Sequence, residues 1–485
     1  MPELLKRSST IPDAPATTRF MLFGGGNFIR AFAGWMIDLL NKQTDFEGGM
    51  MIVKPTAGRD YSDLRSQEGL YHVLLNGQQD GQLVDEAQLI SSVTDIIHVY
   101  EQWNAFLRSA KNLNIKYIIS NTTESGIVFV ETDKVDQAPP SSFPAKICLW
   151  LFERFKYFAG DPAAGAVFFP CELSADNGSS LKQCILQYIE YWQLAPEYRD
   201  WVEQHCLFCN TLVDRIVTGY PSKDEEKYHE RLGYRDQLLA IGEPYHSWVI
   251  QGPPDLAKSL PFHQIGLNVQ WVEDLTKYRA QKVKILNGAH TSMVPTGHLA
   301  GMVSVKETID HPALGAFINS LLEEEVWPTL AFEKKELTDF TRKTMDRFKN
   351  PFLFHKLLDI SLNSISKFKA RLLPSLLSFY QQNEVCPPRI TFAFSALLLM
   401  YRGKWHGQAI PLRDAPEVLT FCQSLWMEAD DHQEVVEKFL ANESFWGQDL
   451  NQINGLGDQM VHYVQAIQQD GILSSLAQIK PYANL

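Results

Sequence analysis

A lysine, an asparagine and a histidine stand close together in the second half of this 485-residue chain. They are Lys282, Asn287 and His290, in the segment KVKILNGAH. In a regular α-helix, which turns about 100° per residue, their side chains share an arc of about 140°. An amine, an amide and an imidazole on one face suit the reduction of a carbonyl group, because the oxygen needs a proton as hydride reaches the carbon.

Each of the three groups has a chemical role in such a reaction. A lysine in a pocket poor in water has a lowered pKa and can deliver a proton near neutrality. An asparagine N–H can stabilise the developing alkoxide, and a histidine can orient a hydroxyl. The alternative stays open on these residues alone: Lys282 is then a surface lysine, as Lys284 is expected to be, and the Asn287-Gly288 pair ends a helix.

A glycine-rich segment near the start of the chain, FMLFGGGNFIR, could bind a nucleotide. Its glycines are Gly24, Gly25 and Gly26. They follow a short apolar run, and a helix that begins near Asn27 would direct its N-terminus at a phosphate. The segment departs from the GxGxxG fingerprint at Ile29, and the second apolar run ends at Lys54 rather than at an acidic residue. A tight turn without a ligand is the alternative.

The apolar patterns predict the elements that position these groups. Short runs rich in apolar and β-branched residues alternate with amphipathic stretches over residues 20–275, which is typical of a parallel, doubly wound sheet. From about residue 276 the apolar residues follow helical spacing. We therefore expect an α/β Rossmann-like N-terminal domain, residues 1–275, followed by a mostly α-helical C-terminal domain, residues 276–485.

Composition excludes several classes of function. The net charge of −13 and the absence of a Lys/Arg block argue against nucleic-acid binding. The first twenty residues lack the apolar core of a signal peptide, and no later run of about 18 apolar residues occurs, so we expect a cytoplasmic protein with no membrane partner. Cys206 and Cys209 form a lone CxxC without further ligands, so we expect plain thiols and no metal site.

Longer segments resemble the polyol-specific long-chain dehydrogenases, the mannitol dehydrogenase family. The spacing KxxxxNxxH matches Lys282, Asn287 and His290, and the family's glycine motif GxGxFxR matches the turn through Phe28 and Arg30. One branch, which interconverts tagaturonate and altronate, resembles the chain most. The segments that indicate this branch are SNTTESGI (120–127), PCELSADNG (170–178), CNTLVDRIVTGYP (209–221), EPYHSWVI (243–250), LNGAHT (286–291) and SLNSISKFKARLLPS (361–375).

The resemblance implies roles for these residues. It implies an oxidoreductase of hexuronate catabolism that reduces tagaturonate with NADH, with Lys282 as general acid and base and Asn287 holding the substrate oxygen. His290 would position the substrate or assist Lys282. It also implies that no metal takes part. One departure concerns the second oxyanion asparagine of mannitol dehydrogenases, whose matching position is Leu173; Asn177 matches a separate asparagine. A fructuronate or polyol dehydrogenase and a non-catalytic nucleotide-binding homologue are the alternatives.

Further cofactor and substrate contacts follow from the same segments. Thr122 and Glu124 follow a predicted strand and could line the nicotinamide ribose, or cap a helix instead. Asp214 and Arg215 stand between apolar residues, which favours a structural ion pair or a substrate contact by Asp214.

Basic residues are candidates to bind the negative charges of the substrate and of the cofactor. Lys367 and Arg371, four residues apart, would share a helix face and are candidates to bind a substrate carboxylate. A solvated basic face and a pairing with acidic neighbours are the alternatives. The resemblance implies NAD, whereas Lys54 could pair with the 2′-phosphate of NADP.

Overall fold

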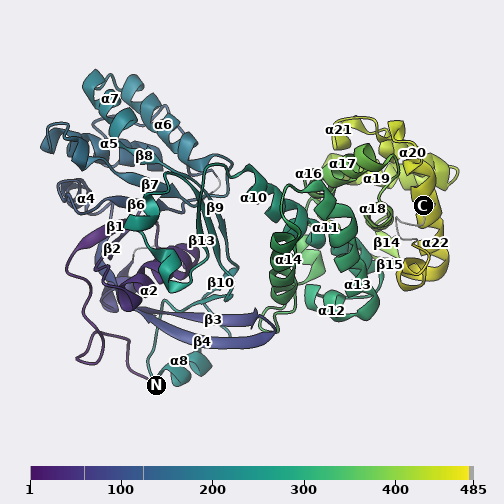
Figure 1. Cartoon of the computed structure of the whole chain (residues 1–485), viewed down its shortest axis with the longest axis horizontal. Helices are drawn as coiled ribbons and strands as arrows, with labels where there is room; N and C mark the ends of the chain where they lie inside the picture. The colour runs from purple at the N-terminus through teal and green to yellow at the C-terminus, as the bar shows by residue number, and fades with distance from the viewer. Residues whose placement is uncertain (1, 59–60, 124, 480–485) are drawn as a thin grey trace. The chain divides into compact units, whose positions relative to one another are not determined.

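The computed structural model describes residues 2–58, 61–123 and 125–479 (Figure 1). The chain divides into two compact units. One comprises Met1–Asn76 and Leu83–Leu275, and the other comprises Gly77–Gln82 and Thr276–Leu485. Within the described residues, no helix is both long enough and apolar enough to cross a bilayer.

A six-stranded sheet organises the first unit. Its order is β5 (Val93–His98), β2 (Gly49–Lys54), β1 (Thr18–Phe23), β6 (Tyr117–Ser120), β7 (Val167–Pro170) and β8 (Leu207–Phe208). All neighbouring pairs are parallel. The chain moves outward from β1 in one direction and then from β6 in the other, so the strand order reverses between β1 and β6. In such sheets the crevice at that reversal binds ligands.

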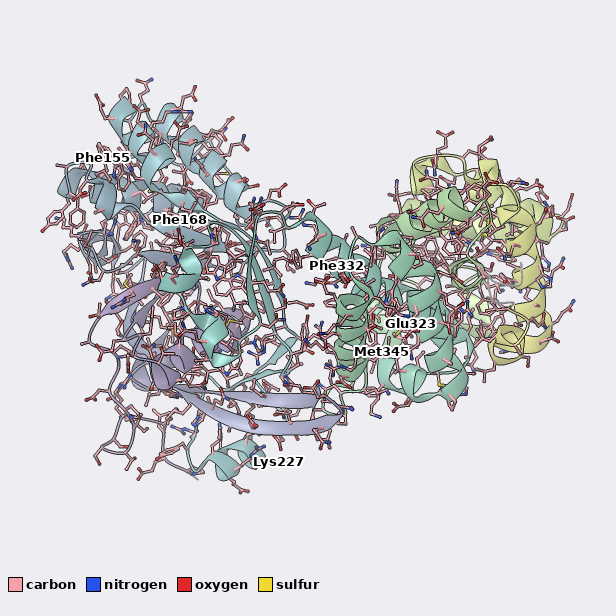
Figure 2. The ribbon with its side chains drawn as sticks, in the orientation of Figure 1. Phe155, Phe168, Lys227, Glu323, Phe332 and Met345 are labelled. Carbon is pink, nitrogen blue, oxygen red and sulfur yellow. The ribbon has the colours of Figure 1, made fainter. Side chains whose placement is uncertain are left out.

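Alternate residues of β1 face opposite sides of this sheet, as the twofold period of a strand requires. Phe20 and Leu22 join one apolar cluster, whereas Met21 and Phe23 join another. The second cluster includes Phe168, which stacks on Phe208 with ring centroids 4.5 Å apart, and it packs against Phe155 (Figure 2). Both faces of the sheet are therefore covered, which explains why its central strands consist mainly of apolar residues.

Two smaller sheets complete the strands of the first unit. One has the order β10 (Val217–Gly219), β11 (Ala240–Gly242), β3 (Tyr71–Gln79), β4 (Gln82–Ile90); the other has the order β13 (Val269–Val272), β12 (Ser247–Gln251), β9 (Asn210–Asp214). The main helices are α2 (Trp35–Gln43), α4 (Trp103–Ser109), α5 (Phe143–Tyr157), α6 (Asn177–Tyr191), α7 (Pro196–His205) and α8 (Glu225–Leu232).

Helices dominate the second unit (Figure 1). They include α10 (Thr276–Gln281), η4 (Lys282–Asn287), α11 (Gly288–Leu299), α12 (Val305–Asp310), α13 (Pro312–Ser320), η5 (Leu321–Val326), α14 (Lys334–Phe348), α15 (Leu357–Ile360), α16 (Ser364–Arg371), α17 (Leu373–Asn383), α18 (Pro388–Met400), α19 (Pro416–Glu428), α20 (His432–Leu440), α21 (Glu443–Trp446) and α22 (Leu456–Leu476). Every residue of α18 is buried, including the polar Arg389, Thr391 and Ser395, and the helix packs against α11 and α22. The predicted fold class, α/β followed by helical, is confirmed.

Candidate active site

The glycine turn lies where β1 ends, beside the end of β6. Gly24 has φ +123°, which disfavours other residues, and a Cβ there would lie 3.3 Å from the carbonyl oxygen of Asn121. Its N–H donates to the carbonyl of Val53 at the end of β2. The turn is therefore fixed at the point where the strand order reverses, the position at which such a sheet binds a dinucleotide.

A continuous helical segment follows the turn, from Asn27 through α2. It consists of α1 (Asn27–Ile29), the π-helix η1 (Arg30–Gly34) and α2. The buried Arg30 side chain donates to the carbonyl of Gly25 at 3.0 Å and to Oδ1 of Asn27 at 2.8 Å. The ring of Phe28 stacks on Phe32 at 5.0 Å. Arg30 thus holds the shape of the turn, and Phe28 anchors the helix that follows it.

A cavity of about 660 Å³ opens beside this turn. Its walls include Gly25, Asn27, Lys54 and Tyr61. The Lys54 ammonium donates to Thr56 and lies 5.7 Å from the ring of Tyr61, and burial lowers its pKa. Gly25 donates its N–H to the Tyr61 hydroxyl at 2.6 Å. Backbone donors, glycines without side chains and a nearby cation fit the phosphates of a dinucleotide.

The loop after β6 is held by a buried carboxylate from the loop after β7. Glu172 accepts hydrogen bonds from the backbone N–H of Thr122, the Thr122 hydroxyl and the Ser120 hydroxyl, at 2.9, 2.9 and 3.0 Å. Thr122 therefore lies in the loop at the carboxyl end of β6, and the preceding Asn121 lies beside Gly24 of the glycine turn. The contact of Thr122 with a cofactor stays a prediction. The predicted contact Glu124 lies outside the described residues.

Asn177 ties several chain segments together. Its amide donates to the carbonyls of Pro170, Glu172 and Thr211, and its oxygen accepts from the Thr211 N–H. The N–H groups of this amide therefore already donate within the protein, and none is left to bind a substrate oxygen. Leu173, at the position of the second oxyanion asparagine, has 67% of its surface exposed.

The buried side chain of Arg215 contacts two carbonyl oxygens and an indole ring. Its guanidinium donates to the carbonyls of Glu243 and Ala31 at 2.8 and 2.6 Å, and lies 4.1 Å from the Trp35 ring centroid. Burial lowers its pKa to about 9. Asp214, the last residue of β9, is only partly buried, so its carboxylate remains a candidate for substrate contact.

Lys282, Asn287 and His290 lie on one helical stretch of the second unit. Lys282 begins η4, Asn287 ends it, and His290 is in the first turn of α11. The helix continues through Asn287-Gly288, so the alternative that this pair ends a helix is wrong. The expected spacing of 100° per residue is also wrong here, because η4 is a π-helix with i→i+5 hydrogen bonds and a wider turn. Such turns occur often at functional sites.

Aromatic side chains surround His290. Its ring lies 4.5 Å from that of Phe348, at the end of α14, and 5.3 Å from that of His355. Burial lowers the pKa of His355. Lys284 is not the surface lysine expected, since its half-buried ammonium donates to the carbonyl and hydroxyl of Thr329, both at 3.2 Å.

One of the two predicted cations contacts the helix of His290. Arg371, the last residue of α16, has a half-buried guanidinium whose Nη1 lies 3.3 Å from the hydroxyl of Thr291. Gly288 allows this approach, because a Cβ there would lie 3.2 Å from the side chain of Leu372. Lys367 donates to the carbonyl of Ile360 at 3.0 Å, and burial, with repulsion from Arg371, lowers its pKa.

The CxxC cysteines are free thiols in buried positions. Burial raises the pKa of both Cys206 and Cys209 to about 12. Among the described residues, no group of three or more His, Cys, Asp or Glu side chains is arranged to hold a metal ion.

Sequence reasoning missed Tyr61, Glu172 and His355. Tyr61 has no motif or spacing that predicts its contact with the glycine turn, 36 residues earlier. Glu172 follows the apolar run that forms β7, and a carboxylate beside such a run could have signalled a buried partner. His355 gives no such signal.

Comparisons with known proteins agree with this architecture. Residues 18–264 match the mannitol dehydrogenase Rossmann domain, and residues 274–468 match the mannitol dehydrogenase C-terminal domain. The chain is 41% identical to altronate oxidoreductase of Yersinia enterocolitica over 95% of its length and 96% of the relative's. It is 40% identical to altronate oxidoreductase of Bacillus subtilis, with 95% of each chain covered.

Two solved structures share the fold. A substrate-free D-sorbitol dehydrogenase superposes with a TM-score of 0.79 over 98% of this chain and 100% of its own, at 22% identity. Mannitol 2-dehydrogenase of Pseudomonas fluorescens, in a ternary complex with NAD and D-mannitol, superposes with a TM-score of 0.67, covering 98% and 99% at 22% identity. Both domain matches and the identity across nearly the whole chain establish that this protein belongs to the mannitol dehydrogenase family.

Proposed function

We propose that this chain is a cytoplasmic oxidoreductase of hexuronate catabolism that reduces tagaturonate to altronate with NADH, and catalyses the reverse oxidation. The observation that supports this most is the identity of about 41% to altronate oxidoreductases over 95% of the chain, which includes both domains. The shared fold alone would support any polyol dehydrogenase, because one fold serves many substrates.

The second unit supplies the groups for proton transfer. As hydride reaches the carbonyl carbon, Lys282 gives a proton to the carbonyl oxygen, and it recovers that proton in the reverse direction. The Asn287 amide donates a hydrogen bond to the same oxygen as negative charge develops there. His290, whose ring packs against those of Phe348 and His355, orients a substrate hydroxyl. When bound, NADH supplies the hydride.

The first unit supplies the dinucleotide contacts. Gly24, Gly25, Gly26 and Asn27 would contact the pyrophosphate, together with Phe28 in the helix that follows the turn. Thr122 and Glu124, which follow β6 in the sequence, would line the nicotinamide ribose. We assign NAD as the cofactor. NADP is the alternative, because the Lys54 ammonium lines the same cavity and could pair with a 2′-phosphate.

Arg371 is our candidate for the substrate carboxylate. Its half-buried guanidinium contacts the residue after His290 and provides paired donors that suit a carboxylate. We expect Arg371→Leu to raise the KM for tagaturonate at least tenfold, with a smaller effect on a neutral ketose such as fructose. Lys367 and Asp214 are secondary candidates for substrate contact.

A control on the same helix makes the Arg371 result specific. Lys369→Met also removes a cation from α16, but the Lys369 ammonium lies near Gly447 rather than Thr291. Steady-state kinetics of the two variants should differ for tagaturonate. Equal changes in KM would argue that Arg371 contributes only to the positive charge of the helix.

An absorbance assay tests the proposed reaction. Purified protein is mixed with tagaturonate and NADH, and loss of the NADH absorbance is followed, with fructuronate, fructose and NADPH run in parallel. Rapid loss with tagaturonate and NADH is the expected result. Turnover only with fructuronate or fructose would assign another branch of the family, and cofactor binding without turnover on any ketose would favour a non-catalytic homologue.

A further inference from the structure

The hydroxyl of Tyr61 accepts a hydrogen bond from the backbone of the glycine turn. It accepts the N–H of Gly25 at 2.6 Å, which is shorter than the usual distance for such a bond. The ring also contacts the turn, since a Cβ on Gly25 would lie 2.7 Å from the Tyr61 Cζ atom. Tyr61 thus covers Gly25 with both its ring and its hydroxyl.

An anionic ligand would bind through this same Gly25 N–H. Backbone N–H groups between a β-strand and a helix bind phosphate oxygens, and glycine permits their close approach. Arg30 already uses the carbonyl of Gly25, so the N–H is the polar group of this residue that faces a ligand. A phosphate oxygen and the Tyr61 oxygen cannot both lie at hydrogen-bonding distance along that one N–H.

We propose that Tyr61 competes with the pyrophosphate of the dinucleotide for the Gly25 N–H, and so sets the affinity for the cofactor. This inference rests on the proposed function, because it requires a dinucleotide in the cavity. Tyr61 must leave the turn when the cofactor binds, and the hydrogen bond lost in that movement weakens binding.

The surroundings of Tyr61 favour its movement. Its ring is only partly buried. Its hydroxyl accepts the Gly25 N–H, the Lys54 ammonium lies 5.7 Å from the ring centroid, and the charge of Arg30 also acts on it. Lys54 has another partner in Thr56, so release of Tyr61 does not leave that cation without one. The pKa of Tyr61 is raised, chiefly by burial, so the group remains a neutral phenol and its bond to Gly25 involves no charged group.

Binding of NADH to the Tyr61→Phe variant tests the proposal. Phenylalanine keeps the ring but cannot accept the Gly25 N–H. We expect its Kd for NADH, measured by calorimetry on the full chain, to be about fivefold lower than that of the wild type, the value of one neutral hydrogen bond. Tyr191→Phe is the matched control, because its hydroxyl donates to the carbonyl of Glu131, away from the cavity, and its Kd should not change.

Hydrogen exchange gives a readout that needs no cofactor. Without NADH, the peptide that contains Gly25 should exchange its amide hydrogens faster in Tyr61→Phe than in the wild type or in Tyr191→Phe. Equal or weaker NADH binding by Tyr61→Phe would overturn the inference and assign Tyr61 to holding the cofactor or to neither role. Absence of NADH binding in every variant would overturn the proposed cofactor as well.

Discussion

Replacing Lys282 by methionine should lower kcat for tagaturonate reduction about 10³-fold, since a positioned proton donor contributes 10²–10⁴-fold to such a rate. Methionine keeps the length of the aliphatic side chain but has no proton to give. Lys282 belongs to the second unit, whereas the glycine turn belongs to the first, so the Kd for NADH should stay close to the wild-type value. Stopped-flow absorbance gives the rate, and calorimetry gives the Kd.

Lys284→Met is the control for this result. Lys284 lies two residues away in the same π-helix, but its ammonium donates to Thr329. Activity of this variant should remain within a few-fold of wild type. If Lys284→Met lost as much activity as Lys282→Met, or if Lys282→Met kept more than a tenth of the wild-type kcat, Lys282 would not be the proton donor.

Replacing Glu325 by glutamine should destabilise the helical unit at pH 5 by about 2 kcal/mol, the cost of a buried polar group without its partner. The two oxygens of the fully buried Glu325 accept the N–H groups of Arg389 and Ile390, each at 2.8 Å, at the start of α18. The NH₂ group of glutamine cannot accept, so one of these donors loses its acceptor.

The effect of Glu325→Gln on the free energy of unfolding should depend on pH, and the raised pKa of Glu325 gives the direction. Burial raises the pKa of Glu325 from 4.5 to about 7. Between these values the folded chain holds a proton that the unfolded chain has released, so this carboxyl makes the folded state less stable as the pH rises from 4.5 to 7. Glutamine has no such proton, so the stability difference between wild type and variant should shrink by pH 8.

Thermal unfolding at pH 5, 6, 7 and 8 measures this difference. Glu324→Gln is the matched control, because Glu324 also pairs with Arg389, at 2.7 Å, but has 41% of its side chain exposed. Its effect should be small at every pH. A difference for Glu325→Gln that grows with pH would contradict the prediction, since it would mean that Arg389 and the two N–H groups stabilise the ionised carboxylate more than burial penalises it.

The sequence by itself determined the fold class and the family, and it singled out the segments that carry the candidate site residues. Alternation of apolar runs predicted the parallel sheet, and helical spacing predicted the second unit, because both periods come from the local geometry of strand and helix. The glycine turn could be placed at the end of β1 for the same reason. The grouping of Lys282, Asn287 and His290 followed from their closeness in sequence.

Only the tertiary structure decided which distant residues complete these segments. Tyr61 reaches Gly25 from 36 residues away, Glu172 reaches Thr122 from 50, and Arg371 reaches Thr291 from 80. The sequence pattern also did not predict that η4 is a π-helix. A periodic pattern records which face of an element is buried, but not which other element covers it. That choice depends on the packing of the whole chain, where contacts between distant segments together outweigh local preference.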